Sequence, residues 1–133
     1  MSKILASIKN IKSVDNLNIV TFDFFGNTLK MMSLELGNKI QVGSKVLLGV
    51  KPTSIAIAKE FSGEISFSNR LQGEIVNIDK GELLCNLKIE IAGSIFESII
   101  TKDSAHSMDL KLNDEVTIFI KASELSIVDF YDG

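Results

Sequence analysis

A short run of hydroxyl-bearing residues in the second half of the chain has the spacing of an anion-binding corner. Residues 101–105, Thr-Lys-Asp-Ser-Ala, follow a β-like apolar run that ends at Ile100. A threonine followed three residues later by a serine, at the start of a helical turn, leaves hydroxyls and unpaired backbone N–H groups on one side. Partial positive charge at such a turn attracts anions.

A second set of donors ends a later strand. Lys121, Ala122 and Ser123 add an ammonium group and another hydroxyl, which a barrel fold could bring close to the first set. Together the two sets predict an oxyanion pocket made of hydrogen-bond donors rather than a catalytic centre. The alternative is that Thr101 only caps a helical turn and that Lys121 is a solvated surface lysine.

Length and composition limit the classes of protein to consider. The chain has 133 residues, 45% of them hydrophobic and 23% charged, which suits one ordinary soluble domain or two very small ones. A net charge of −3 gives no basic footprint for nucleic acid. One cysteine excludes an internal disulfide framework, and the sequence has neither a membrane-length apolar run nor a cleavable leader. We therefore expect a cytoplasmic protein that does not bind nucleic acid or membranes.

Apolar residues alternate along most of the chain, which predicts an all-β fold. The clearest strand runs from Leu83 to Ile91, where apolar and polar positions alternate strictly. Gly26-Asn27 and Ala92-Gly93 predict tight turns, and Pro52 marks a corner between two short strands. One short helix is expected near 104–108. The remaining expected strands cover 19–25, 28–36, 46–50, 55–58, 71–78, 95–100, 116–121 and 125–128.

The two halves of the chain repeat the same pattern. An offset of 67 in the numbering (75 − 8) places Ile8 on Ile75, and a later offset of 70 (121 − 51) places Lys51 on Lys121. The first half is therefore shorter by three positions, at the place where the second half carries the Thr101 corner. We predict two small barrels, residues 1–62 and 63–133, with a degenerate first copy.

Other chemistries find little support in the sequence. His106, the only histidine, and Cys85 have no partners at metal-ligand spacing, so no metal site is expected. No Ser/His/Asp set forms around His106, which argues against a hydrolase. Phe22, Phe24 and Phe25 could stack bases, but no basic residue lies among them, so packing in a core or interface is predicted.

The second half resembles a Mop repeat, a molybdate-binding module of the TOBE superfamily. The resemblance is carried by Ser66 to Gly73, Gly81, the Thr101 corner, residues 110–116 and the segment Ile-Lys-Ala-Ser that ends at Ser123. Such modules occur as free molbindins (molybdenum-pterin-binding proteins) and as parts of molybdate-responsive regulators and transporter ATPases. Two repeats with nothing attached resemble a tandem molbindin.

The resemblance implies a fold, an assembly and a set of ligand residues. It implies two tandem OB-like five-stranded β-barrels, six repeats per ring and therefore a homotrimer, with oxyanion sites at subunit interfaces. Lys121 and Ser123 would complete a site from another subunit. The implied oxyanion-binding positions are Ser66, Ser68, Asn69, Arg70, Thr101, Lys102, Ser104, Ala105, Lys121, Ala122 and Ser123, with Lys51, Pro52 and Thr53 in the degenerate repeat.

The chain departs from the family pattern at the start of the module. The family begins with Ser-x-Arg-Asn, and the matching positions here are Ser66, Ser68 and Asn69. Ser68 stands where the family has arginine, and Arg70 comes two residues later. At this position the chain therefore has a hydroxyl in place of the family's guanidinium group.

The expected function is that of a binding protein and not of an enzyme. Its ligand would be molybdate or tungstate, without an organic cofactor, and its role molybdenum storage or homeostasis. The alternative is an oxyanion-sensing module that acts on a molybdate transporter ATPase or a transcription factor. The absence of a helix-turn-helix before Ile4 and of a nucleotide-binding motif favours the first role.

Overall fold

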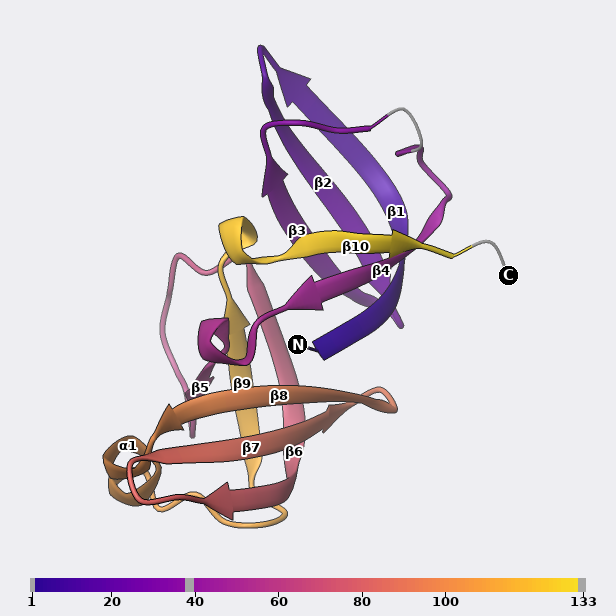
Figure 1. Cartoon of the computed structure of the whole chain (residues 1–133). Helices are drawn as coiled ribbons and strands as arrows, with labels where there is room; N and C mark the ends of the chain where they lie inside the picture. Colours follow the sequence, from indigo (N-terminus) through magenta and orange to yellow (C-terminus); the bar gives the residue numbers. More distant parts are fainter. Residues whose placement is uncertain (1, 38–39, 132–133) are drawn as a thin grey trace.

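The computed structural model describes residues 2–37 and 40–131 and consists of two curved antiparallel sheets of five strands each (Figure 1). This confirms the predicted all-β class, with OB-like barrels and one short helix. The strand orders are β10-β4-β1-β2-β3 and β5-β9-β6-β7-β8. The strands are β1 Ser2–Val14, β2 Leu17–Phe24, β3 Asn27–Ser33, β4 Lys45–Val50, β5 Ala56–Ala58, β6 Asn69–Lys80, β7 Leu84–Ile91, β8 Ser94–Thr101, β9 Glu115–Ile120 and β10 Ser126–Phe130; the helices are α1 Lys102–Ser107 and the 3₁₀ turns η1 Pro52–Ser54 and η2 Ala122–Glu124.

The internal repeat is visible element by element. The first three strands of each half are related by an offset of 67, as β1 at Ser2 and β6 at Asn69 show (69 − 2), and the later elements by 70, as η1 and η2 show (122 − 52). Even the β-bulge after Ile8 recurs after Ile75. The change of offset falls where α1 is inserted, as the sequence predicts.

The hairpin turns follow from the backbone angles that their residues allow. Ala92 and Gly93 have φ angles of 50° and 81° between β7 and β8, and Phe25 and Gly26 have 47° and 86° between β2 and β3. Two successive positive φ angles match the right-handed twist of the paired strands. The second of these turns lies one residue earlier in the chain than predicted.

The aromatic cluster of the first repeat is divided by this turn. Phe22 and Phe24 are buried, whereas Phe25, at the tip of the turn, is 67% exposed. The Phe25 ring still meets that of Phe24 edge to face, with centroids 5.3 Å apart. Core packing is therefore confirmed for Phe22 and Phe24, whereas for Phe25, which lies on the surface, packing in an interface stays a prediction. Cys85 is buried, which confirms the inward face predicted for it.

The last strand of each repeat joins the sheet of the other repeat, which the sequence analysis did not predict. β5 pairs with β9 through Ala56 and Phe119, and β10 pairs with β4 through Ser126 and Gly49. Figure 1 shows β10 beside β4 in one sheet and β5 beside β9 in the other. The two repeats are therefore joined by backbone hydrogen bonds in both directions.

Two quasi-equivalent side-chain contacts pin the sheets together. The Asn69 amide accepts from the backbone N–H of Lys30 at 2.6 Å and donates to its carbonyl at 2.9 Å. At the matching position the Ser2 hydroxyl accepts from the backbone N–H of Glu97 at 2.9 Å. Lys30 and Glu97 lie on β3 and β8, which are edge strands of their sheets. The start of each repeat thus protects an edge of the other.

One continuous hydrophobic core fills both barrels. Its largest buried side chains include Phe22, Phe24 and Phe96, and the Phe24 and Phe96 rings meet edge to face with centroids 5.8 Å apart. Phe24 belongs to the first repeat and Phe96 to the second, so aromatic packing crosses between them. No helix within residues 2–37 and 40–131 is long and apolar enough to cross a membrane.

Candidate functional site

The Thr101 corner forms a capped helical turn, which both interpretations of the sequence predict. Thr101 is the N-cap of α1, and its Oγ1 accepts from the backbone N–H of Ser104 at 3.1 Å and donates to Ser104 Oγ at 2.9 Å. Both residues are exposed. The helix begins at Lys102, two residues earlier than expected, because the threonine caps it directly. Two hydroxyls therefore lie together on the surface at the start of the helix.

Contacts with the rest of the barrel fix α1 in place. The backbone N–H of Lys102 donates to the carbonyl of Leu83 at 2.9 Å, which ties the helix start to the β6–β7 hairpin. Ala105 is buried, and Leu110 behind it is buried too. The predicted Ala105 position thus places its side chain in the core. Lys102 and Asp103 are exposed and put one positive and one negative charge beside the hydroxyls.

A cavity of about 400 Å³ lies between the repeats and brings several predicted residues together. Lys121 lines it together with Thr53 from the first repeat and Ile100, the residue before Thr101. The Lys121 Nζ lies 5.9 Å from the centroid of the Phe67 ring, and among the described residues Lys121 makes no ion pair. Its charge is therefore available in a cavity that adjoins the end of β8. Ser54, Ile55, Ala56, Phe67, Ile99 and Glu124 complete the lining.

Within one chain, the two 3₁₀ turns pack against different edge strands. η1 packs against β8, which ends at Thr101, whereas η2 packs against β3, after which the described residues form no helix. Lys51 is the N-cap of η1 and Pro52 its first residue, and η1 lies beside β8, whereas Ala122 and Ser123 belong to η2, beside β3. The positions predicted in the degenerate repeat, Lys51, Pro52 and Thr53, therefore belong to a segment next to β8, the strand that leads into the Thr101 corner.

Two serines that the sequence analysis missed hold this arrangement. Ser98, fully buried on β8, donates to the carbonyl of Ile55 at 2.7 Å and so fixes the end of η1 to that strand. Ser54 donates to the Glu124 carboxylate at 3.1 Å, which joins η1 to η2. A signal for Ser98 exists in the sequence, because this polar residue shares the inward parity of Phe96.

The residues at the start of the module fall into two groups. Asn69 is 1% exposed, and its amide is engaged with Lys30. Ser66, Ser68 and Arg70 are not buried, and only Phe67 of this segment lines the cavity. The structure thus gives Asn69 a structural contact and leaves the Arg70 guanidinium on the surface.

Other reactive groups lie apart from these residues. Burial raises the pKa of the Cys85 thiol, whose nearest charged influences are Lys80 and Asp79. Within the described ranges no three His, Cys, Asp or Glu residues gather in a way that could hold a metal ion. The chemistry that this region offers is that of neutral hydroxyls, backbone N–H groups and lysine, together with the carboxylates of Asp103 and Glu124.

Comparison with known proteins places these features in a family. The TOBE domain matches residues 65–127, a range that contains both the Thr101 corner and Lys121. Molybdenum-pterin-binding protein 1 of Clostridium pasteurianum is 35% identical over 65 residues, which cover 48% of this chain and 96% of that protein. The molybdate/tungstate import ATP-binding protein WtpC of Pyrococcus abyssi is 26% identical over 110 residues, which cover 83% of this chain but only 32% of that protein.

A solved structure confirms the fold of both repeats. The cytoplasmic molybdate-binding protein ModG, crystallised with molybdate bound, superposes with a TM-score of 0.88 at 22% identity and covers 93% of this chain and 92% of that one. At this identity the likeness establishes the two-repeat architecture. Because the sequence match to the Clostridium protein spans nearly its whole length, the chain belongs to the family of the molybdenum-pterin-binding proteins.

Proposed function

We propose that this protein binds molybdate or tungstate in the cytoplasm and serves molybdenum storage or homeostasis. The observation that carries the proposal is the pair of exposed hydroxyls at Thr101 and Ser104, inside a region that matches proteins named for binding molybdenum. The ligand would be the intact oxyanion, held by hydrogen bonds, and no organic cofactor or catalytic step is required.

The chemistry of the donors suits a tetrahedral dianion. Charge-assisted hydrogen bonds contribute about 1.5–3 kcal/mol each, and micromolar affinity corresponds to about −8 kcal/mol. Four or more donors are therefore needed once the entropy of binding is subtracted. The proposed donors are the Thr101 and Ser104 hydroxyls, the Ala105 N–H, Lys121 and Ser123, with Lys51 and Thr53 at the matching positions of the first repeat.

We further propose that the chain forms a homotrimer in which Lys121 and Ser123 serve the corner of a neighbouring subunit. Within one chain Lys121 lines the cavity that adjoins β8, whereas η2, which contains Ser123, packs beside β3, where the sequence has no second Thr-x-x-Ser corner. The position of η2 supports a partner for Ser123 outside the chain. Ile95, on the outward face of β8, is 43% exposed and would be covered by that partner. Light scattering at micromolar concentration tests this assembly, and a monomer would remove the interfacial site.

A regulatory role on a transporter ATPase or a transcription factor is the second candidate. The alignment with an import ATP-binding protein covers only 32% of that protein and so reflects the shared module. Such a role predicts that an ATPase or a transcription factor copurifies with this chain.

Ligand-induced stabilisation tests the main proposal. An anion that binds only the folded protein stabilises it by about 2.7 kcal/mol at a hundredfold excess over Kd. With about 2.1 cal/mol/K of unfolding entropy per residue, this raises Tm by roughly 10 °C. Elemental analysis of the purified protein identifies the ion independently. Sulfate at equal concentration should give a much smaller shift, and an equal shift would contradict the proposal.

Three substitutions locate the donors. Lys121→Ala should remove most of the shift in Tm, Ser104→Ala should remove part of it, and Lys51→Ala should have a smaller effect because the corner occurs once per chain. The matched control is Lys12→Ala, which removes an exposed lysine from the first repeat far from both η turns. All four variants should have nearly the same Tm without ligand.

A further inference from the structure

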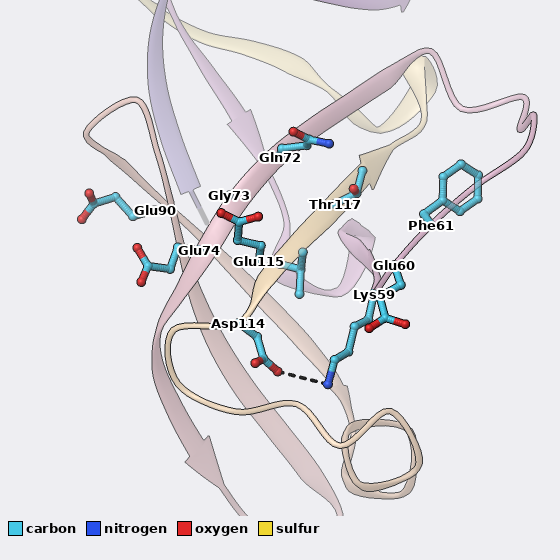
Figure 2. A pocket seen from close by; sticks show the side chains of 11 residues that line it. Lys59, Glu60, Phe61, Gln72, Gly73, Glu74, Glu90, Asp114, Glu115 and Thr117 are labelled. Carbon is cyan, nitrogen blue, oxygen red and sulfur yellow. Dashed lines mark ion pairs between the residues drawn. The ribbon is translucent and has the colours of Figure 1, made fainter.

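Lys59 connects the exchanged strand of the first repeat to the helix that carries the hydroxyl corner. It follows β5 directly, and its Nζ donates to the carbonyls of Asp109 at 2.9 Å and Met108 at 3.3 Å. The same Nζ lies 3.3 Å from Asp114 Oδ2. Figure 2 shows the Lys59 side chain extended toward Asp114. Three oxygen atoms thus surround one ammonium group.

The carbonyls that Lys59 contacts are those at the end of α1. The last carbonyls of a helix have no partner within it, and a positive charge there is favourable. Met108 is the C-cap of α1, and Asp109 follows it with a positive φ of 50°. Lys59 therefore supplies a hydrogen-bond donor to the Met108 and Asp109 carbonyls, where the helix ends and the chain turns toward β9.

Asp114 is itself held in place on the other side of this contact. Its Oδ2 accepts from the backbone N–H of Lys111 at 2.9 Å. This hydrogen bond, with Lys59 adding to it, lowers the pKa of the Asp114 carboxyl. The side chain of Lys59 is only 28% exposed, whereas that of Lys111 is 68% exposed and pairs with Asp109 at 3.3 Å. Lys59 is thus the more enclosed of the two cations beside the helix.

The contact is specific to the repeat that has the helix. The offset of 70 that relates η1 to η2 (122 − 52) places Lys59 on Asp129 and Ser44 on Asp114. A bulge between Ile127 and Asp129 brings Asp129 opposite Leu47, so in the paired strands Asp129 corresponds to Ala58. Within the described ranges, the sheet that contains β10 has no equivalent of α1, and β10 carries no lysine. The Lys59 ammonium group, the Asp114 carboxylate and α1 therefore occur together in the second sheet.

We infer that Lys59 is a positioning residue for the oxyanion site, an inference that rests on the proposed function. A six-residue helix is only about 9 Å long, so its end and its beginning move as one body. By holding the end of α1 from a strand of the other repeat, Lys59 keeps the Thr101 and Ser104 hydroxyls in place before the anion arrives. Preorganised donors bind more tightly because less ordering occurs on binding.

Binding measurements on two lysine variants test this role. Lys59→Met keeps the apolar stem and removes the charge, and it should weaken molybdate binding on the order of tenfold, as loss of one charged hydrogen bond would. Lys59→Arg should retain most of the affinity. Lys111→Met is the matched control, since it removes an exposed lysine from the same turn, and it should bind as the parent does. Calorimetry at 25 °C, well below each variant's Tm, separates affinity from stability.

Hydrogen exchange without any anion supplies a readout that is independent of binding. Lys59→Met should accelerate amide exchange in residues 102–110 relative to the parent and to Lys111→Met, with little change in β6 and β7. The inference would be overturned if folded Lys59→Met bound molybdate with the parental affinity. It would also be overturned if the loss of affinity were explained entirely by the fraction of the variant that is unfolded. If the parent binds neither molybdate nor tungstate, the proposed function fails and the inference with it, while the exchange result still reports whether Lys59 holds the helix.

Discussion

Replacing Asn69 by leucine should destabilise the protein, because it removes the hydrogen bonds between Asn69 and the Lys30 backbone of the first repeat. The Asn69 amide gives the backbone N–H and carbonyl of Lys30 a partner outside the β2–β3 ladder, at 2.6 and 2.9 Å. The leucine side chain has the same number of heavy atoms and the same branching at Cγ, but it can neither donate nor accept a hydrogen bond. The substitution therefore removes the pairing without opening a large cavity.

The size of the effect follows from these two hydrogen bonds. Each contributes about 0.5–1.5 kcal/mol, and a donor or acceptor left buried without a partner costs about 1–3 kcal/mol. Because Asn69 is 1% exposed, water has little access to the Lys30 groups from this side. We expect a loss of about 2–4 kcal/mol in the free energy of unfolding, which lowers Tm by roughly 7–14 °C for a chain of this length.

Urea unfolding and calorimetry measure this loss, and Ser2→Ala provides the internal comparison. Ser2 makes one hydrogen bond, to Glu97, at the quasi-equivalent position, so its removal should cost about half as much. Molybdate affinity in folded Asn69→Leu should stay close to that of the parent. A variant with parental stability but much weaker anion binding would refute the reasoning, because it would make Asn69 a ligand rather than a contact between sheets.

Two further predictions concern the second barrel. Gly73→Ala should lower the free energy of unfolding by about 1–3 kcal/mol or more, as is typical of overpacking. A Cβ at this position would lie 2.5 Å from Ile91 Cγ1 and 2.8 Å from the Glu90 carbonyl oxygen. Chemical unfolding measures the loss, and parental stability would contradict the prediction. Cys85 should react with a thiol reagent far more slowly in the folded protein than in urea, because the thiol is buried and its pKa is raised. Absorbance follows the reaction, and equal rates in the two conditions would show that the core opens readily.

Much of the fold could be predicted from the sequence because local signals determine it. Strict alternation predicted β7, and Ala92 and Gly93, which have positive φ angles in the structure, predicted its turn. The two repeat offsets, 67 and then 70, also follow from sequence alone. The exchange of β5 and β10 could not be predicted in this way, because both strands carry the same pattern and either sheet would accept either strand.

The candidate site was predictable in part for a related reason. The Thr101 cap and Ser104 form a local motif, and the structure shows the two hydroxyls 2.9 Å apart. The roles of Ser98, Ser54 and Lys59 depend on residues 43 or more positions away in the chain, such as Ile55 for Ser98. Periodicity reports which face a side chain takes but not which distant backbone group it meets.

The strand exchange predicts that neither repeat folds alone as a monomer. Residues 1–62 lack β10, which covers the free edge of β4, and residues 63–133 lack β5, which covers β9. Each fragment is also small for an independent core. Separately expressed fragments should therefore give little cooperative melting, and mixing them should restore it with a stoichiometry of one to one.

The fragment of residues 63–133 could also pair with a second copy of itself. β10 and β5 are related by the repeat offset of 70 (126 − 56), so β10 of one copy could occupy the β5 position of another. Residues 63–133 should then form dimers as their concentration rises, and added residues 1–62 should convert those dimers into the mixed pair. Sedimentation and far-ultraviolet circular dichroism follow both steps. A monomeric, cooperatively melting 63–133 fragment would mean that the exchanged strands add stability without being required for each barrel to fold.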